Sequence, residues 1–316
     1  MYTQNQSTVT EFILLGLSSD PFIQVLLFNI FLVAYMFTLT GNFLLILAVK
    51  TDKRLHNSMY VFLSSLSLLD ICCVSAIVPK MLVNFLSSKK SISFTGCAVQ
   101  FCAVLTLGQT QCLLLAFMAY DRYVAICIPL HYNMIMNTTV SFCIVSISWL
   151  TGCVISSFDT YFTFNLTFCG PNTINHFFCE LPLLLRLSCS GISVMNIIKL
   201  IFLPLMLFIP LSLILFSYIR IIIAVMTIRL GRSKAFSTCI PHLVVVVMFY
   251  GSAMFMYVRP EHLVSGDTDK NTDTDKRVAV FYTVITPMLN PLIYSLRNKD
   301  VQKAIRQLIR AKKDCS

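Results

Sequence analysis

Seven long stretches of this chain are almost continuously apolar, and polar residues gather between them. A helix needs about 20 predominantly apolar residues to cross the hydrocarbon core of a membrane. Each stretch is close to that length or longer, so we predict one membrane-spanning helix in each. The predicted spans cover residues 22–49, 58–79, 97–120, 140–162, 197–219, 238–258 and 278–296.

The continuously apolar pattern within the stretches disfavours a transmembrane β-barrel, whose strands alternate between polar and apolar residues over about ten positions. Asp20 and Pro21 suit the start of the first helix, because Asp accepts hydrogen bonds at an N-cap and Pro fits the first helical position. The predicted fold class is an all-α membrane protein, with a seven-transmembrane helix bundle over residues 22–296. Residues 1–21 precede the bundle, and residues 297–316 follow it as a tail that is expected to form a short amphipathic helix.

The distribution of Lys and Arg indicates which way the chain crosses the membrane. Residues 1–21 contain neither, whereas residues 297–316 contain seven. Because cytoplasmic flanks carry an excess of Lys and Arg, we predict an extracellular N-terminus and a cytoplasmic C-terminus. The outer loop over residues 80–96 runs against this trend with three Lys, but the tail outweighs it. The glycosylation sequon at Asn5 then lies outside the cell.

Composition supports the membrane assignment. Hydrophobic residues make up 57% of the chain and charged residues only 12%, against about 25% charged in soluble domains. This excludes both a water-soluble domain and a disordered chain, since low hydrophobicity is the signature of disorder. The net charge of +10 lies beside the predicted spans, so it indicates a membrane surface rather than a nucleic-acid partner.

Two motifs lie at the inner ends of predicted spans. Residues 118–127 read MAYDRYVAIC, and residues 287–301 read PMLNPLIYSLRNKDV. They resemble the DRY and NPxxY motifs of rhodopsin-like G-protein-coupled receptors. Further stretches narrow the resemblance, which covers about residues 9–310, to olfactory receptors of the tetrapod-type class. These stretches are EFILLGL (11–17), LHNSMY (55–60), PKML (79–82), IPLHY (128–132), SYIRI (217–221) and KAFSTCIPHL (234–243).

The resemblance implies that the inner motifs form a switch that couples to a G protein. In this reading Arg122 pairs with Asp121 at rest and swings to receive a G-protein helix on activation. Pro291 interrupts the seventh helix and gives Tyr294 freedom to rotate inward. The alternative for Arg122 is an interfacial arginine that only extends its charge to the membrane boundary. The implied coupling set is Asp121, Arg122, Tyr123, Asn290, Pro291 and Tyr294.

Asp70 is an acid in the middle of a predicted span, and a charge at that depth indicates a functional site. Asn42 and Asn290 are expected to face it, and Gln111 completes this polar node. The resemblance implies that such a cluster can hold a sodium ion, whereas the alternative is a hydrogen-bonded node with water and no ion. Many family members carry Glu where Gln111 stands, so the loss of that charge favours the hydrated node.

Four cysteines are predicted on the outer side, where oxidising conditions permit three pairings. The resemblance implies a disulfide between Cys97 and Cys179, which leaves Cys169 with Cys189. From the sequence alone, a bond between Cys97 and Cys189 is equally open.

His176 and Glu180 flank Cys179 in an HxxC[DE] pattern that has been linked to soft metals in a few family members. A disulfide-bonded Cys supplies no thiolate, so these two residues are weak candidates and we predict no metal site. No cofactor is expected either.

Counting along the helices from Arg122 gives a set of inward-facing residues in the outer half of the bundle. The set is mostly apolar with a few polar groups, which is the usual composition of a small-molecule pocket. Gly108 leaves room for a ligand, and Gln109, Tyr257 and Thr283 are each expected to donate a hydrogen bond to a ligand oxygen. The alternative is a stripe that only packs helix against helix. The predicted ligand-binding set is Val104, Leu105, Gly108, Gln109, Cys112, Phe202, Leu203, Met206, Tyr250, Ala253, Met254, Tyr257 and Thr283.

The expected ligand is small, neutral and mostly apolar, such as an aldehyde, ketone, ester or alcohol. No Lys or Arg reaches the depth of the predicted pocket, which disfavours a carboxylate. Amine receptors of the superfamily carry an Asp where Val104 stands, so a cationic ligand would lack that counterion.

The chain lacks HExxH, GxSxG and P-loop motifs, so it is not expected to be an enzyme. The resemblance implies an odorant receptor of the plasma membrane, in sensory cilia. Its implied partners are a small-molecule odorant, membrane lipids and the stimulatory olfactory-type G protein, which raises cyclic AMP; no nucleic-acid partner is expected. The alternatives are a non-odorant chemoreceptor of the same fold and a transporter, although a transporter normally shows internal repeats and none is visible.

Overall fold

Among the residues that the computed structural model describes, seven helices are long and apolar enough to cross a membrane, which confirms the predicted fold class. The structure describes residues 9–169, 171–189, 201–227, 232–258 and 268–313, so the sequon at Asn5 lies outside the described residues. The seven candidate spans are Pro21–Thr51, Ser58–Leu86, Phe94–Cys127, Thr138–Phe164, Ile201–Thr227, Thr238–Tyr257 and Thr272–Ser295.

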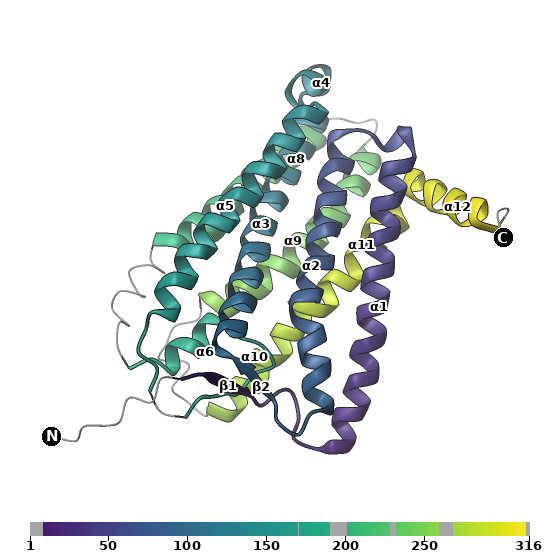
Figure 1. Ribbon diagram of the computed structural model, residues 1–316. Coiled ribbons are helices and arrows are strands. Elements are labelled where there is room, and N and C mark those ends of the chain that lie inside the picture. The colour runs from purple at the N-terminus through teal and green to yellow at the C-terminus, as the bar shows by residue number, and fades with distance from the viewer. Residues whose placement is uncertain (1–8, 170, 190–200, 228–231, 259–267, 314–316) are drawn as a thin grey trace.

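The helices form a bundle whose ends are easily told apart in Figure 1. We call the end that carries β1 the outer end and the end that carries α4 and α12 the inner end, following the sequence prediction. The long helical elements are α1 (Pro21–Thr51), α2 (Ser58–Leu86), α3 (Phe94–Cys127), α5 (Thr138–Phe164), α8 (Ile209–Thr227), α9 (Arg232–Tyr257), α10 (Thr268–Val280), α11 (Thr286–Arg297) and α12 (Lys299–Lys313). The short elements are η1 (Lys53–Leu55), η2 (Pro129–His131), α4 (Tyr132–Ile135), α6 (Leu181–Arg186), and the π-helical turns η3 (Pro204–Phe208) and η5 (Phe281–Ile285).

Polar side chains determine where several helices begin. The Asp20 carboxylate accepts hydrogen bonds from the backbone N–H groups of Phe22 and Ile23, at 2.8 and 3.1 Å, so α1 begins as the sequence predicts. Ser93 caps α3 and Asn137 caps α5 in the same way. Each cap satisfies N–H groups that have no partner within the helix.

The side of α1 that faces away from the other helices shows where lipid meets the bundle. Phe22, Val33 and Phe43 are 81%, 69% and 59% exposed, although α1 is strongly apolar. A helix with this many exposed large apolar side chains is stable only when a nonpolar environment covers them, which the hydrocarbon core of a membrane supplies.

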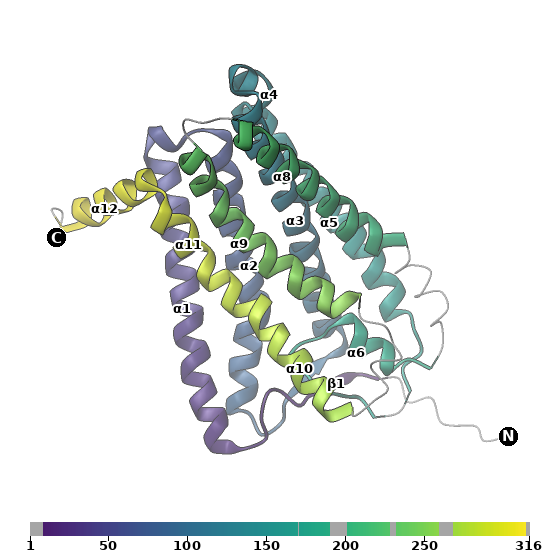
Figure 2. The same ribbon diagram turned by 180° about the vertical axis from the view of Figure 1, so that it is seen from behind.

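The helix α3 lies at the centre of the bundle and packs against α2, α5, α8 and α9 (Figures 1 and 2). At Gly152 of α5 the two helices come close together. A Cβ atom added there would lie 2.9 Å from the backbone oxygen of Thr106 and 3.3 Å from the backbone nitrogen of Thr110. The absence of a side chain at Gly152 therefore allows the two helix backbones to approach.

Substituting leucine for Gly152 should lower surface expression and thermal stability. The new side chain meets backbone atoms of α3 that cannot rotate away, and such overpacking costs about 1–3 kcal/mol. Thermal unfolding of detergent-solubilised receptor measures the effect. Cys153→Leu, at the neighbouring exposed position, is the control and should change stability little. Equal stability of the Gly152 variant and this control would contradict the close helix approach.

Three segments that are distant in sequence form a small sheet at the outer end. The strand β1 (Glu11–Leu14) lies between β2 (Ser91–Ser93), to which it is antiparallel, and β3 (Thr173–Ile174), to which it is parallel. The Lys89 ammonium lies 2.6 Å from the Glu11 carboxylate and holds the pKa of Glu11 below its usual value. The sequence predicts residues 1–21 only as a segment before the bundle, so this sheet is a feature that the structure adds.

The helix α12 leaves the bundle at the inner end, as Figure 1 shows in yellow. Val301 and Ala304 are buried against the bundle, whereas Lys303 and Arg306 are exposed. The helix is therefore amphipathic, in the region where the sequence predicts an amphipathic helix. Arg54 donates a hydrogen bond to Gln307 at 3.2 Å and joins α12 to the first inner loop.

Candidate functional site

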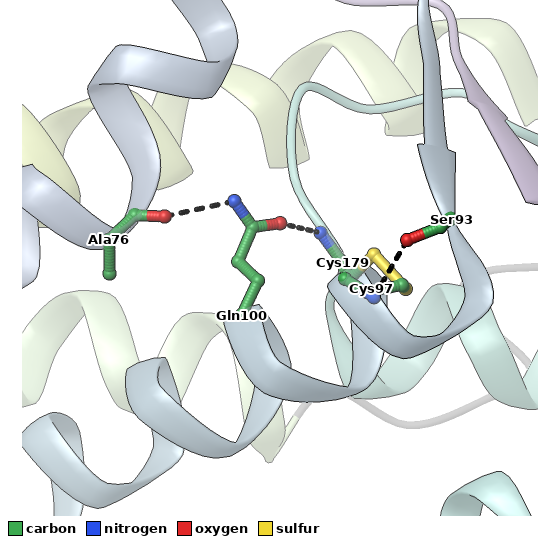
Figure 3. Close-up of a disulfide and its surroundings, with 6 residues drawn as sticks. Ala76, Ser93, Cys97, Gln100 and Cys179 are labelled. Carbon is green, nitrogen blue, oxygen red and sulfur yellow. Dashed lines mark hydrogen bonds between the residues drawn. A yellow bond between two sulfur atoms is a disulfide. The ribbon is translucent and has the colours of Figure 1, made fainter.

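The second outer loop is the segment that follows α5 and contains Cys179. A disulfide between Cys97 and Cys179 ties this loop to α3 (Figure 3), with Cα atoms 5.7 Å apart. The Gln100 side chain reinforces this attachment. Its Nε2 donates to the backbone oxygen of Ala76 on α2, at 3.0 Å, and its Oε1 accepts from the backbone N–H of Cys179, at 3.1 Å. The loop residues that follow Cys179 are thereby held at a fixed position over the bundle.

The second pair, Cys169 and Cys189, is also joined, with Cα atoms 5.9 Å apart. Backbone hydrogen bonds run alongside this bond. The N–H of Cys169 donates to Leu187 at 3.1 Å, and the N–H of Cys189 donates to Thr167 at 3.0 Å. The pairing of Cys97 with Cys189, which the sequence left open, does not occur in the structure.

His176 lies in the apolar interior of the outer loop rather than in a ligand set. Its ring stacks on Phe177 with centroids 4.6 Å apart and meets the edge of Phe178 at 4.9 Å. Burial lowers the pKa of His176 to about 3, so the ring is neutral. Within the described ranges, no group of three or more His, Cys, Asp or Glu side chains is placed to hold a metal ion.

The predicted ligand residues that the structure describes lie on α3, around η3, on α9 and in η5. Open space exists at Gly108, where an added Cβ atom would meet no other atom within 4 Å. Cys112, Met206, Tyr250 and Thr283 are buried. The others are partly buried: Val104, Leu105, Gly108, Gln109, Phe202, Leu203, Ala253, Met254 and Tyr257.

Several of these residues also pack between elements. Phe202 contacts Leu185 of α6, and Leu203 and Met254 pack against the main apolar core. The Tyr250 hydroxyl donates to the backbone oxygen of Cys112 at 2.9 Å and so joins α9 to α3. Tyr250 and Cys112 therefore support the wall of the site through their own contact.

The three expected hydrogen-bond donors are already engaged within the protein, which corrects the sequence analysis. Gln109 Nε2 donates to Asp159 Oδ2 at 3.2 Å. The Tyr257 hydroxyl donates to Glu180 Oε1 at 3.5 Å, and the Thr283 hydroxyl donates to the backbone oxygen of its own helix at 2.6 Å. Asp159 and Glu180, two acids that were not predicted in the site, are the reason for Gln109 and Tyr257, whereas Thr283 bonds to the backbone oxygen four residues earlier.

A groove elsewhere on the bundle contains none of the predicted ligand residues. It measures about 440 Å³ and lies where α2, β2 and the start of α3 meet, lined by residues that include Lys80, Ser93 and Gln100. Gln100 is already engaged by Ala76 and Cys179.

At the inner end the structure differs from the resting pair that the sequence predicts. Among the described residues, no ion pair joins Arg122 to Asp121. The Asp121 carboxylate instead accepts a hydrogen bond from the Tyr132 hydroxyl of α4, at 2.9 Å. The physical reason is that α4 folds back against the inner end of α3 and brings this phenol to the carboxylate. Burial, together with the charge of Asp121, raises the pKa of Tyr132.

The Arg122 side chain lies among the inner ends of other helices. Its charge acts on Tyr218 of α8, His242 of α9 and Tyr294 of α11. The next residue, Tyr123, packs against α8: the centroid of its ring lies 6.3 Å from that of Phe216. The arginine is therefore positioned to respond when these helices move relative to α3.

His242 is a buried residue at this end that the sequence analysis missed. Its Nδ1 lies 2.7 Å from the Tyr218 hydroxyl, and its Nε2 lies 3.1 Å from the backbone oxygen of Leu115. The histidine thus links α9 to both α8 and α3. An ionisable residue inside a predicted span is the signal that could have identified it.

The polar node is smaller than predicted. Asn290 Nδ2 donates to both oxygens of Asp70, at 3.1 and 2.9 Å, but Asn42 donates instead to the backbone oxygens of Thr38 and Pro287. The reason is that Pro291 has no N–H to donate to the oxygen four residues earlier, so the amide of Asn42 takes its place. Pro291 also contacts α1 at Gly41, where an added Cβ would lie 3.2 Å from the proline ring.

Gln111 of the predicted polar node and Tyr294 of the predicted coupling set are both buried. Gln111 lies on α3 and forms no hydrogen bond to Asp70 or Asn290 within the described part of the chain. Tyr294 is 7% exposed, and its hydroxyl has no hydrogen-bond partner among the described residues. The question of a sodium ion or a hydrated node stays as the sequence left it.

Comparisons with known proteins agree over nearly the whole chain. The family model described as olfactory receptor matches residues 31–312. The chain is 48% identical to human olfactory receptor 13D1, over 98% of this chain and 88% of that protein. It is 47% identical to mouse olfactory receptor 5AP2, over 97% and 95%, and 47% identical to mouse olfactory receptor 5M5, over 98% and 96%.

Proposed function

The chain belongs to the olfactory receptor family, and from this premise we propose that it binds small, mostly apolar odorants in the outer half of its bundle. It is a multi-pass membrane protein and a receptor, not an enzyme, and its family implies odorant ligands and G-protein coupling. We further propose that its N-terminus is extracellular, that it acts at the plasma membrane of sensory cilia, and that it raises cyclic AMP through the stimulatory olfactory-type G protein.

The open space at Gly108 is the observation that carries the proposed ligand site. A Cβ added there would meet no atom within 4 Å, whereas one added at Gly152 would collide with a neighbouring helix. The predicted ligand residues on α3, α9 and around η3 and η5 are mostly apolar with a few polar groups, as in most small-molecule sites. This combination supports a ligand site rather than a stripe that only packs helices.

The inner end supports coupling to a partner. Arg122 lies 14 positions after Gly108 on one continuous helix, which corresponds to about 21 Å along the axis. A ligand that favours one arrangement of α3 against α9 at the outer end shifts the same equilibrium at Arg122. The exposed Lys303 and Arg306 on α12 suit the anionic lipids of the cytoplasmic leaflet.

The experiment is a cyclic AMP assay in cells that contain the olfactory-type G protein. A chemically diverse panel of volatile molecules should include agonists with a saturable dose response. A response restricted to non-volatile molecules would instead support a non-odorant chemoreceptor. Saturable flux of a panel compound into receptor vesicles, without cyclic AMP, would identify a transporter and contradict the proposal.

Substituting phenylalanine for Gly108 should remove the odorant response without reducing surface expression. The Cβ atom meets no other atom within 4 Å, and the ring takes up open space that the ligand requires. Dose–response curves normalised to surface receptor measure the effect, with at least about a hundredfold loss of potency expected. Gly251→Phe is the matched control, because Gly251 also has open space around it but lies exposed on α9. A normal response of the Gly108 variant would contradict the site.

A further inference from the structure

We propose that the polar end of the odorant is a hydrogen-bond donor, an O–H or N–H group, which Glu180 and the Gln109–Asp159 pair accept. The inference rests on the proposed function, because it describes the ligand of the same site. The sequence suggested the reverse, namely donors in the protein and an oxygen acceptor on the ligand. It is the free hydrogen-bonding atoms in the site that reverse this expectation.

Glu180 supplies the first acceptor. The residue is 3% exposed and directly follows Cys179, whose disulfide and Gln100 contact fix its position. Its Oε1 accepts from the Tyr282 hydroxyl at 2.8 Å and from the Tyr257 hydroxyl at 3.5 Å. Its Oε2 is buried and has no partner within the described residues. An ionised carboxylate can only accept, so a donor is the group that satisfies Oε2.

The pair of Gln109 and Asp159 supplies the second acceptor. Because a carboxylate only accepts, the amide must turn its NH₂ group toward Asp159, and the distance is 3.2 Å. This orientation leaves Gln109 Oε1 as the free atom of the amide, buried and without a partner in the part of the chain described. Gln109 is one turn before Cys112 in the predicted ligand set on α3, and its amide faces α5 through Asp159.

Tyr257 connects the two acceptors. Its hydroxyl donates to Glu180, and the negative charges of both Glu180 and Asp159 act on it. The three side chains come from the outer loop, α5 and α9, and both carboxylates act on the one phenol. A ligand whose donor group lies beside Tyr257 therefore enters an environment of negative charge that contains two buried acceptor atoms without a partner among the described residues.

The protonation of Glu180 gives the proposal a second readout. Burial raises the pKa of Glu180 to about 7, assisted by the charge of Asp275 from α10, while the hydroxyls of Tyr282 and Tyr257 act in the opposite direction. Above this pH the carboxyl is ionised and only accepts. Below it the carboxyl is protonated and can donate to a carbonyl oxygen. The preference for donor ligands should therefore weaken as the external pH falls from 8 to 6.

The test presents each carbon skeleton in four forms: primary alcohol, primary amine, aldehyde and methyl ether, over chains of about six to ten carbons. Cyclic AMP is measured in cells with receptor confirmed at the surface. Wild-type receptor should respond to alcohols or amines at concentrations about tenfold to a hundredfold lower than to the matched aldehydes and ethers. This ratio of concentrations corresponds to the free energy of one hydrogen bond to a charged group. Comparing alcohols with amines shows which donor the site receives.

Two variants locate the acceptors. Glu180→Gln should reduce alcohol potency by about tenfold or more, raise the relative potency of aldehydes, and abolish the pH dependence of the alcohol-to-aldehyde ratio. Asp159→Asn should reduce the preference for donor ligands independently of the Glu180 variant. The reason is that an uncharged partner no longer forces the amide orientation of Gln109. The Asp273 carboxylate at the outer end is 67% exposed. Asp273→Asn is therefore the control, and its ratio of alcohol to aldehyde potency should match that of wild-type receptor.

The outcomes separate the two levels of the account. If aldehydes or ethers match the alcohols in wild type, or if Glu180→Gln reaches the surface with an unchanged ratio and pH profile, the donor inference is wrong and the receptor function stands. If no form of any skeleton raises cyclic AMP in cells with surface receptor, the proposed ligand class itself is contradicted.

Discussion

Receptor in which Arg122 is replaced by alanine should reach the cell surface, bind odorant and produce no cyclic AMP. Arg122 lies at the inner end of α3, and its charge acts on Tyr218 of α8, His242 of α9 and Tyr294 of α11. Its removal deletes the cation that the resemblance assigns to the G-protein contact. The outer site lies about 21 Å away along α3 and keeps its own contacts.

Three measurements on the Arg122 variant distinguish a coupling role from a folding role. Surface receptor is counted by antibody, odorant binding by displacement of a labelled agonist, and signalling by cyclic AMP. Arg306→Ala removes an exposed cation from α12 at the same end and should retain the response. A full cyclic AMP response from surface-expressed Arg122→Ala receptor would show that the side chain is only an interfacial arginine.

Loss of either Cys97 or Cys179 should prevent surface expression almost completely. Removal of a native disulfide typically costs about 2–5 kcal/mol, and here the same bond also positions Glu180. The double variant Cys97→Ser/Cys179→Ser should be no worse than either single variant, because the two residues act as one bond. Flow cytometry of surface receptor, with total receptor measured after permeabilisation, gives the three values.

Cys143→Ser is the control for this series, since Cys143 is a free, exposed cysteine on α5 and its loss should leave surface expression unchanged. The assignment of the disulfide has a specific contradiction. If Cys189→Ser, and not Cys179→Ser, showed the same non-additivity with Cys97→Ser, the loop would be tied to α3 through the other cysteine.

The features that the sequence predicted are those that depend on local pattern. The seven spans follow from the length of the apolar runs, and the start of α1 follows from Asp20 and Pro21. The amphipathic α12 follows from the alternation of apolar and basic residues after Asn298. The positions of Gly108 on α3 and of Arg122 at its inner end follow from the helical period alone.

The features that the sequence did not predict depend on which side chains meet across helices. Gln109 meets Asp159 fifty positions later, and this contact converts an expected donor into an acceptor. Asn42 bonds to Pro287 because a proline four residues further on leaves that carbonyl unpaired. Neither contact leaves a periodic signal in the chain, since each depends on the rotation and depth of two separate helices.

The sheet at the outer end escaped prediction for a related reason. Its strands have two to four residues each and come from three different outer segments. Segments of that length carry no clear alternation, and their pairing is determined by the helices and disulfides that bring them together. His242 is different, because an ionisable residue in a predicted span is visible in the sequence and could have been weighed.

The most direct test of the account is nucleotide exchange on the stimulatory olfactory-type G protein by purified receptor in lipid nanodiscs. Binding of a non-hydrolysable GTP analogue to the Gα subunit is followed with and without an agonist from the panel. The account predicts saturable, agonist-dependent exchange for wild-type receptor and none for Arg122→Ala or Gly108→Phe. Exchange that is independent of agonist, or that survives in either variant, would contradict the claim that a ligand in the outer half of the bundle drives G-protein activation at its inner end.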